Sequence, residues 1–548
     1  MSRSREWLSG ALWLREDETP FPWQEQLLER FVRGDVPRTL DIPTGLGKTA
    51  VMAIWLVARA HGAPLPRRLV YVVDRRAVVD QATEVAEGLR RFVDEHPAFK
   101  HALGLEGRAL PISTLRGQHV DNKDWLEDPA SPAIIVGTVD MIGSRVLFEG
   151  YGTSPKMRPY HAGLLGADAL VVLDEAHLVP PFERLLETIA DGGGTFGARD
   201  EVLRQLVPAF RLISLSATGR VTGEKSFGLQ REDLSHRIVR RRLDAAKRLS
   251  VLEPVDAATL ADALAEHAWM LTDKGQRALR IIVFSDKREV AEKAKLAVDE
   301  LAKGDKKQAI AECAIDTELF VGGRRVFERD LAARWLETNG FLARTKVART
   351  QAAFVFATSA GEVGVDLDAD HMVSDLVAWE RMVQRVGRVN RRGDGDARVM
   401  VVPESPSKDV EKAAAKALVD RGAKDLAVLA NAERLARVRE LVCRLPDKDG
   451  ARDASPGAIC EIKVRAKDDP NLRALIDSAT TPVPLRPALS RALVDAWSMT
   501  SLKEHTGRPE IEPWLRGWIK DDPPQTAVVW RTYLPVRTCG DDATISEV

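Results

Sequence analysis

Two series of short apolar runs organise most of this chain. Continuous apolar runs of this kind are typical of buried parallel strands, and helix-like segments between them indicate crossover connections. From about Trp23 to about Gly219 the runs are RRLVYVV, PAIIVG, ALVVLDE and RLISLSAT. A charged stretch, Lys225 to Arg248, precedes the second series, which is ALRIIVFS, AFVFATS, DHMVSDLV and ARVMVVP. The pattern predicts two α/β domains in tandem, each built on a parallel sheet.

Beyond Pro403 the pattern changes to helical runs and proline-containing loops. We expect a smaller, mostly helical accessory domain there, with a helix over Lys408 to Arg439. Two interpretations of Trp514 and Trp518 stay open, a stacking platform for bases or a hydrophobic anchor. The predicted domain boundaries are 1–235, 236–405 and 406–548.

Composition narrows the class of protein. The chain has 548 residues, 80 basic against 81 acidic side chains, so any contact with nucleic acid must be local. Its four cysteines lack CxxC spacing, which argues against a thiolate zinc site and favours a reducing cytoplasm. No run reaches the eighteen or so apolar residues of a membrane span, and we expect a soluble, cytoplasmic protein without a membrane partner.

The string DIPTGLGKTA carries the clearest chemistry. Gly45 and Gly47 allow backbone amides to face a polyanion, Lys48 supplies a charge for the β and γ phosphates, and Thr49 offers a hydroxyl to Mg²⁺. An apolar run before it and TAVMAIWLVARA after it give the strand, loop and helix that a phosphate loop requires. The full pattern has a glycine where this chain has Ile42.

A second element, ALVVLDEAHLVPPF, delivers Asp174 and Glu175 at the carboxyl end of a predicted strand, where ligands of open α/β sheets bind. We expect Asp174 to hold Mg²⁺ and Glu175 to accept a proton from the attacking water. Downstream, VQRVGRVNRRG places Arg388 and Arg391 on one helical face, from which both could reach a γ phosphate. A solvated basic face is the simpler alternative.

Taken in order, these motifs resemble those of a superfamily two helicase of the DEAH-box kind, over residues 20 to 393. The resemblance implies two RecA-like domains with ATP and Mg²⁺ between them. It assigns adenine contact to Gln24 and coupling of hydrolysis to strand movement to His177 of LDEAH, Ser216 and Thr218 of SAT, and Gln384. The ATP-binding set that it implies is Gln24, Thr44, Gly45, Leu46, Gly47, Lys48, Thr49, Ala50, Gly364 and Asp366, with Lys48, Glu175, Arg388 and Arg391 as the catalytic residues.

More narrowly, VVDRRAVVDQA, STLRG, GTVDMIGSRVLF, ELFVGGRR, TSAGEVGVDLD and ERMVQRVGRVNRRGD resemble the CRISPR-associated type I interference helicase, closest to subtype I-G, formerly I-U. Gln118 departs from the glycine that this family often has. The resemblance implies a translocase on single-stranded or R-loop DNA, moving 3′ to 5′ and recruited by a CRISPR surveillance complex. The nucleic-acid contacts that it implies are Arg75, Arg76, Thr114, Arg116, Thr138 and Thr358.

That family usually adds an HD nuclease domain, in which adjacent His and Asp seat transition metals. None of the ten histidines here is followed by aspartate, so no such metal site is expected. The domain is then naturally missing, replaced by a separate nuclease, or cut from a longer chain. Two further functions remain open: an RNA helicase or restriction-type translocase of the same superfamily, and a catalytically weak ATPase that acts as a scaffold.

Overall fold

Most of the chain is described by the computed structural model. The described residues are 2–116, 119–120, 123–197, 200–206, 209–216, 226–304, 313–322, 326–343, 347–405, 423–502, 508–517, 536–539 and 542–545. Among them, no helix is both long enough and apolar enough to cross a membrane.

The first sheet is built from the first series of apolar runs. In the order β4-β3-β5-β2-β6-β7-β1-β8 its strands are parallel, apart from the antiparallel pair β3–β4. Their bounds are β1 Thr39–Asp41, β2 Arg68–Val73, β3 Ile112–Arg116, β4 His119–Val120, β5 Ala133–Thr138, β6 Ala169–Leu173, β7 Arg211–Ser216 and β8 Ser226–Gly228. Every residue of β2, β5 and β6 is buried, as continuous apolar runs predict.

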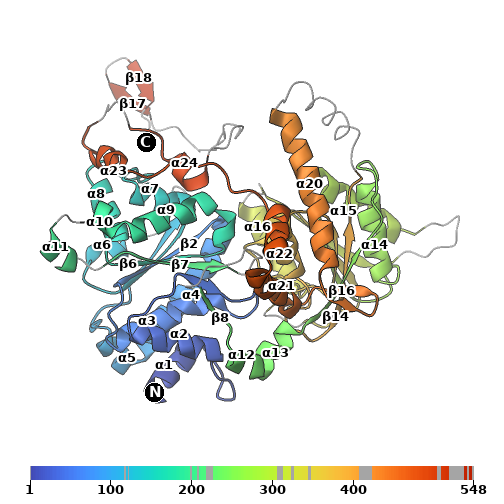
Figure 1. Cartoon of the computed structure of the whole chain (residues 1–548), viewed down its shortest axis with the longest axis horizontal. Helices are drawn as coiled ribbons and strands as arrows, with labels where there is room; N and C mark the ends of the chain where they lie inside the picture. Colours follow the sequence, from blue (N-terminus) through green and yellow to red (C-terminus); the bar gives the residue numbers. More distant parts are fainter. Residues whose placement is uncertain are drawn as a thin grey trace.

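Helices cover both faces of this sheet (Figure 1). One face packs against α1 Ser2–Ala11, α2 Pro22–Val32, α3 Val51–Ala60, α4 Arg76–Glu95 and α5 Pro97–Ala102. The other packs against α6 Asp124–Glu127, α7 Val139–Val146, α8 Arg158–Gly166 and α9 Pro180–Asp191. The short helices α10 Gly193–Phe196, α11 Glu201–Leu206, α12 Arg231–Ser235 and α13 Arg237–Leu243 follow.

The second sheet has the order β11-β12-β10-β13-β14-β9-β16-β15, parallel except at β9–β16 and β16–β15. Its parallel strands are β9 Ala246–Val251, β10 Arg280–Phe284, β11 Ile315–Phe320, β12 Ala352–Ala357, β13 His371–Asp375 and β14 Asp396–Val402. Its helices are α14 Leu260–Leu271, α15 Arg288–Ala302, α16 Val326–Thr338, α17 Ser359–Glu362 and α18 Trp379–Val386. Two α/β domains with parallel sheets are therefore confirmed.

The residues after 405 contribute to both domains. Strands β15 Asp447–Lys448 and β16 Ala451–Asp453 extend the second sheet, and α20 Ala423–Cys443, α21 Pro456–Asp468 and α22 Pro470–Ala479 share its core. By contrast, α23 Arg491–Ser498 and α24 Glu512–Arg516 pack on the first domain (Figure 1). A separate hairpin pairs β17 Val536–Cys539 with β18 Asp542–Ile545. The boundaries at 235 and 405 stay predictions, and the first part of the helix expected over Lys408 to Arg439 lies outside the described residues.

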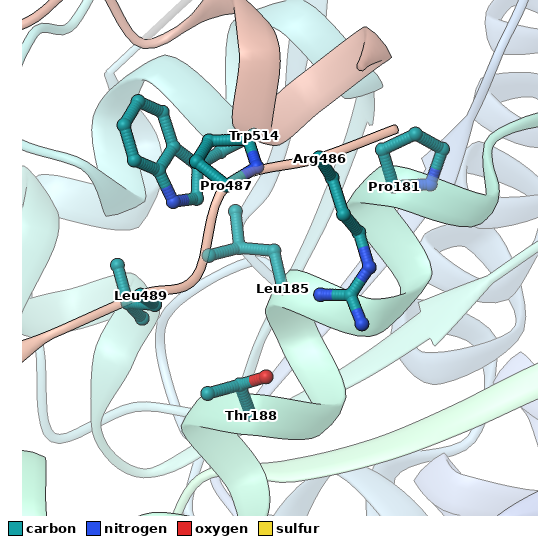
Figure 2. Close-up of a pocket in the computed structure, with 7 residues that line it drawn as sticks. All are labelled: Pro181, Leu185, Thr188, Arg486, Pro487, Leu489 and Trp514. Carbon is teal, nitrogen blue, oxygen red and sulfur yellow. The ribbon is translucent and has the colours of Figure 1, made fainter. Parts of the chain in front are cut away.

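Trp514 belongs to the hydrophobic core of the first domain rather than to an open surface. It is 6% exposed and meets Trp497 edge-on, with ring centroids 5.0 Å apart. A hollow with an empty volume of about 200 Å³ lies beside it, between α9 and the extended segment that leads to α23 (Figure 2). Its lining residues are Pro181, Leu185, Thr188, Arg486, Pro487, Leu489 and Trp514. Trp518, the other residue of the predicted pair, lies outside the described residues.

Replacing Trp497 by alanine tests this docking. The side chain is 1% exposed and its indole N–H donates to the carbonyl of Pro509 at 3.0 Å. We expect the free energy of unfolding of the first domain to fall by about 3–5 kcal/mol, as for other buried aromatic side chains. Chemical denaturation followed by circular dichroism measures the loss. Leu485→Ala is the control, because Leu485 is 78% exposed in the extended segment that leads to α23. It should leave the free energy of unfolding nearly unchanged, and equal losses in the two variants would contradict the docking.

Candidate functional site

The phosphate loop follows β1 as the sequence predicts. Gly45 and Gly47 have φ of +88° and +74°, a left-handed backbone that side chains strongly disfavour. Lys48–Ala50 form a single 3₁₀ turn that continues into α3. Ile42, where the full pattern has glycine, is fully buried in the core. The departure therefore lies directly after β1, in the buried core and before the turn that contains Gly45 and Gly47.

Asp174 and Glu175 lie at the carboxyl end of β6, opposite this loop. Lys48 Nζ lies 3.4 Å from Glu175 Oε1, which brings the two motifs together across 127 residues of sequence. Glu175 has a left-handed backbone with φ of +48°. Burial works against its charge, but Lys48, His177 and Arg388 outweigh burial and lower the pKa of Glu175. It is thus held ionised, the state that a proton acceptor needs.

Tyr71 is a member of this site that the sequence reading did not identify. Its hydroxyl donates to Asp174 Oδ2 at 2.8 Å and also interacts with the Thr49 side chain. The residue is 1% exposed in the middle of β2, within an apolar run that predicts a buried strand and gives no sign of the hydroxyl contact. Burial, followed by repulsion from Glu175, raises the pKa of Asp174. Tyr71 thus links both side chains predicted to hold Mg²⁺.

These donors fit Mg²⁺. The ion prefers oxygen ligands and is usually held by one or two carboxylates together with substrate phosphates, so a cage of protein side chains is not required. Thr49 and Asp174 would supply the hydroxyl and carboxylate, and the ion would neutralise phosphate charge there. In the part of the chain that the structure describes, no group of three or more His, Cys, Asp and Glu side chains is placed to hold a metal.

Helix α18 and the turn after it form the opposite wall. Arg388 donates from Nη1 to the carbonyl of Val365 at 2.8 Å and from Nε to that of Glu362 at 3.1 Å. Arg391 pairs with Asp366, and its backbone N–H donates to Asp368 Oδ1 at 2.8 Å. Both arginines are therefore fixed by the loop that contains Gly364 and Asp366.

The two walls lie close together. A methyl group added to Gly45 would lie 3.4 Å from Cγ and Nε of Arg391, and one added to Gly387 would lie 3.1 Å from Thr44 Oγ1. Arg242, from α13, donates to the carbonyl of Gly45 at 2.6 Å. The cleft thus brings the predicted phosphate loop of the first domain close to Arg242 of α13 and to Arg391 of the second domain.

Positive charge is concentrated around this cleft. Burial, followed by repulsion from Arg391, lowers the pKa of Arg388 to about 10. Burial, again followed by repulsion from Arg391, lowers the pKa of Lys247 to about 7. Burial, Arg391 and Arg241 lower the pKa of Arg242. The sequence reading missed Arg242 and Lys247, because they lie in a charged stretch taken as a separator between domains. Crowded, partly desolvated cations of this kind favour a polyanionic ligand.

His177 and Gln384 connect the domains directly. His177 Nε2 and Gln384 Nε2 are 2.7 Å apart, and both side chains are buried. Ser216, the last residue of β7, follows in the same sheet, while Thr218 lies outside the described residues. Of the predicted coupling residues, the structure therefore brings His177 and Gln384 into contact.

Arg385 holds α18 against the second sheet. Its buried guanidinium donates to Glu362 Oε1 at 2.7 Å and to Ser374 Oγ at 2.7 Å. Fixing α18 in this way also fixes Gln384 and Arg388, its neighbours in sequence. On the other wall, Gln24 accepts the backbone N–H of Phe21 at 2.9 Å, and its amide nitrogen would lie 3.6 Å from a methyl group on Gly47. Gln24 therefore lies beside the predicted phosphate loop, together with Leu46 and Ala50, both buried, and its contact with adenine stays a prediction.

The predicted nucleic-acid contacts lie at or after strand ends of the two sheets, except Thr114, which lies in the middle of β3. Thr114 and Thr138 are 4% and 5% exposed, and Thr358 is 8% exposed at the amino end of α17. Arg75 follows β2 and donates to the carbonyl of Ser359 in the other domain at 2.6 Å. The backbone places Arg76 at the start of α4 and Arg116 at the end of β3. The threonines are covered in this arrangement, whereas Arg75 already spans the two domains.

Two family models match complementary parts of the chain. Residues 17–219 match the model described as type III restriction enzyme, res subunit, and residues 289–394 match CRISPR-associated nuclease/helicase Cas3, C-terminal. No curated protein shows significant sequence similarity. The matched segments hold the two walls of the cleft.

Solved structures share the fold. T. fusca Cas3 with AMPPNP has a TM-score of 0.54 and 16% identity, over 87% of this chain and 56% of that one. T. fusca Cas3 with ADP has a TM-score of 0.54 and 17% identity, over 87% of this chain and 57% of that one. The DUF1998 helicase MrfA bound to DNA has a TM-score of 0.50 and 18% identity, over 85% of this chain and 58% of that one. This chain therefore spans less than two thirds of each. These structures show a shared fold, and the two family models match one segment from each of the two sheet domains.

Tyr71→Phe tests the arrangement at Asp174. Removing the hydroxyl takes away the side-chain partner of Asp174 Oδ2 and leaves the backbone N–H of Glu175 on Oδ1. Partners that orient a metal ligand are typically worth about 10- to 100-fold in metal affinity. We expect the Mg²⁺ dependence of nucleotide binding to shift by that factor, measured by titrating Mg²⁺ against a fluorescent ATP analogue. Binding of the analogue without Mg²⁺ serves as the control and should not change. An unchanged Mg²⁺ midpoint would contradict the role of Tyr71.

Proposed function

We propose that this chain is an ATP-driven translocase that moves along single-stranded DNA and unwinds duplex ahead of it. The observation that carries the proposal is the cleft in which the phosphate loop faces Arg388 and Arg391 of the other domain. Arg391 lies within van der Waals reach of a methyl group added to Gly45. Site roles and DNA as the substrate are part of this proposal.

Closure of the cleft would be driven by charge. The γ phosphate of ATP brings negative charge between Lys48 of one domain and Arg388 and Arg391 of the other, and relieves the repulsion among these cations. Loss of the γ phosphate after hydrolysis removes that bridge, and the domains separate again. Lys48 would hold the triphosphate, and the two arginines would stabilise charge that develops during transfer.

Glu175 is the proposed general base. The lowered pKa of Glu175 leaves it ionised at neutral pH, so it can accept the proton of the water that attacks the γ phosphate. Gln24 would contact the adenine, and Gly364 and Asp366 would complete the far wall. Asp366 also pairs with Arg391, which positions that arginine before ATP enters.

The nucleic acid would cross the strand ends of both domains. Arg75 bridges these ends, and its contact with Ser359 would change each time the cleft opens or closes. Contacts to phosphates position a strand without reading its sequence. We propose 3′ to 5′ movement, and we propose that Arg76, Thr114, Arg116, Thr138 and Thr358 contribute contacts.

The biological setting that we propose is type I CRISPR interference in the cytoplasm, at an R-loop held by a surveillance complex. The match of residues 289–394 to the Cas3 C-terminal model supports this setting. Cleavage is not attributed to this chain, because none of its histidines is followed by aspartate. The unwound strand would be cut by a separate nuclease or by a nuclease domain outside these residues.

One experiment separates this proposal from its alternatives. ATP turnover is measured with single-stranded DNA, single-stranded RNA and duplex, while a forked DNA reports unwinding. We expect stimulation and unwinding with DNA. Stronger stimulation by RNA would favour an RNA helicase, and stimulation by duplex alone a restriction-type translocase. Turnover at background with every polymer would favour a scaffold.

Glu175→Gln should lower ATP turnover by about 10²- to 10⁴-fold, the usual contribution of a general base, with nucleotide binding retained. Steady-state hydrolysis and binding of a fluorescent analogue measure the two effects. Glu187→Gln is the matched control, because Glu187 pairs with Arg184 on the surface of α9. Unchanged turnover in the Glu175 variant would remove this residue from the reaction.

Gln384→Ala should uncouple the domains. Loss of the contact with His177 is expected to reduce stimulation of ATP turnover by DNA roughly two- to thirtyfold, with unstimulated turnover retained. His177→Ala should have the same effect, and the double variant should lose no more than either single one. Independent, additive losses would show that the two side chains do not act as a pair.

A further inference from the structure

Two carboxylates lie at the strand ends where the nucleic acid is proposed to bind. Asp74 directly follows β2, and Asp140 lies in the first turn of α7, which follows β5. The strands are neighbours, with Val73 in register with Thr138, so both carboxylates lie at one edge of the first sheet. Their side chains are 17% and 46% exposed. Negative charge at this edge opposes a phosphate backbone.

A single arginine from the far end of the chain pairs with both. Arg516 donates from Nη2 to Asp140 Oδ2 at 2.9 Å and from Nε to Asp140 Oδ1 at 3.1 Å, a two-point contact that favours arginine. Its Nη1 pairs with Asp74. Burial works against the charge of Arg516, but the contacts with Asp140 and Asp74 outweigh it and raise the pKa. The guanidinium is therefore held as a cation between the two loops.

The position of Arg516 is fixed by packing around α24. The neighbouring Leu515 is 1% exposed, and a methyl group added to Gly143 of α7 would lie 2.4 Å from its side chain. The helix ends at Gly517, whose φ is +81° and where a methyl group would lie 2.6 Å from Pro484. Trp514 lines the adjoining hollow (Figure 2). The apolar contacts thus hold the helix, and Arg516 is left to the carboxylates.

The same loops carry a proposed contact with nucleic acid. Arg75 follows Asp74 directly, and its Nε lies 3.9 Å from the Asp74 carboxylate. Without Arg516, the charges of Asp74 and Asp140 would exceed that of Arg75, and Asp74 would compete with phosphate for this arginine. With Arg516 in place the local charges balance, and Arg75 is available to a phosphate.

We propose that Arg516 is a positioning residue for nucleic-acid binding, which neutralises Asp74 and Asp140 so that the loops after β2 and β5 can accept a phosphate backbone. This inference rests on the proposed function. It assigns the C-terminal segment a part in binding that neither sheet provides alone.

Binding of a fluorescent single-stranded oligonucleotide, measured by anisotropy over a range of salt, tests the proposal. We expect Arg516→Ala to weaken binding about tenfold at low salt and much less at high salt, because salt screens the exposed carboxylates. Arg516→Lys keeps the charge without the two-point contact and should bind nearly as well as the unaltered chain. Arg491→Ala is the matched control, since Arg491 pairs with Asp495 and contacts Thr195 instead.

Rescue distinguishes charge from packing. Asp74→Asn with Asp140→Asn, added to Arg516→Ala, should restore binding, because the unbalanced carboxylates are then gone. A loss that is equal at all salt concentrations and is not rescued, or a Lys variant as weak as the Ala variant, would overturn the inference. So would an Arg516→Ala variant that binds normally. If the unaltered chain binds no oligonucleotide, the proposed function fails with it.

Discussion

Like charges held between the two sheets are the constraint on which the rest of the structure depends. Arg242, Arg388 and Arg391 crowd the phosphate loop, and burial together with their mutual repulsion lowers the pKa of Arg242 and Arg388. Asp366 balances part of this charge through its pair with Arg391. Under the proposed function, an entering triphosphate would offset this repulsion. Binding a triphosphate and closing the domains would then be one event, because the same charges would govern both.

Positioning by a second group recurs wherever a charge matters. Tyr71 orients Asp174, Asp366 orients Arg391, and Arg385 fixes α18, whose following turn carries Arg388. Lys463 of α21 donates to Asp41 at 2.7 Å, at the end of the strand that leads into the phosphate loop. The residues proposed to touch the reacting groups are thus supported from three regions of the sequence. Small changes in those supports should alter geometry at the phosphates without removing any catalytic group.

Much of this site could be predicted from short sequence motifs. Side-chain pairs between distant segments of the chain could not. Gly45 and Gly47 predict a turn because glycine readily adopts a left-handed backbone with positive φ. The apolar run before Asp174 predicts a buried strand. Tyr71 lies inside such a run, where the continuous apolar pattern predicts burial but not a hydroxyl directed at a carboxylate. Arg516 and Asp74 are 442 residues apart, and no periodicity connects them. Pairs of that kind depend on how the domains pack, which a single sequence does not reveal.

The C-terminal region also limits how far the domains can separate. Thr481 donates to the Glu380 carboxylate of α18, in the second domain, while α23 and α24 are packed on the first. The nine steps from Thr481 to Ser490 span at most about 30 Å when fully extended. Glu380 lies on the same helix as Gln384. If the cleft opens as proposed, any separation beyond that span would break the contact of Thr481 with α18, so the segment that carries Arg516 would be linked to the ATP site by a route outside the cleft.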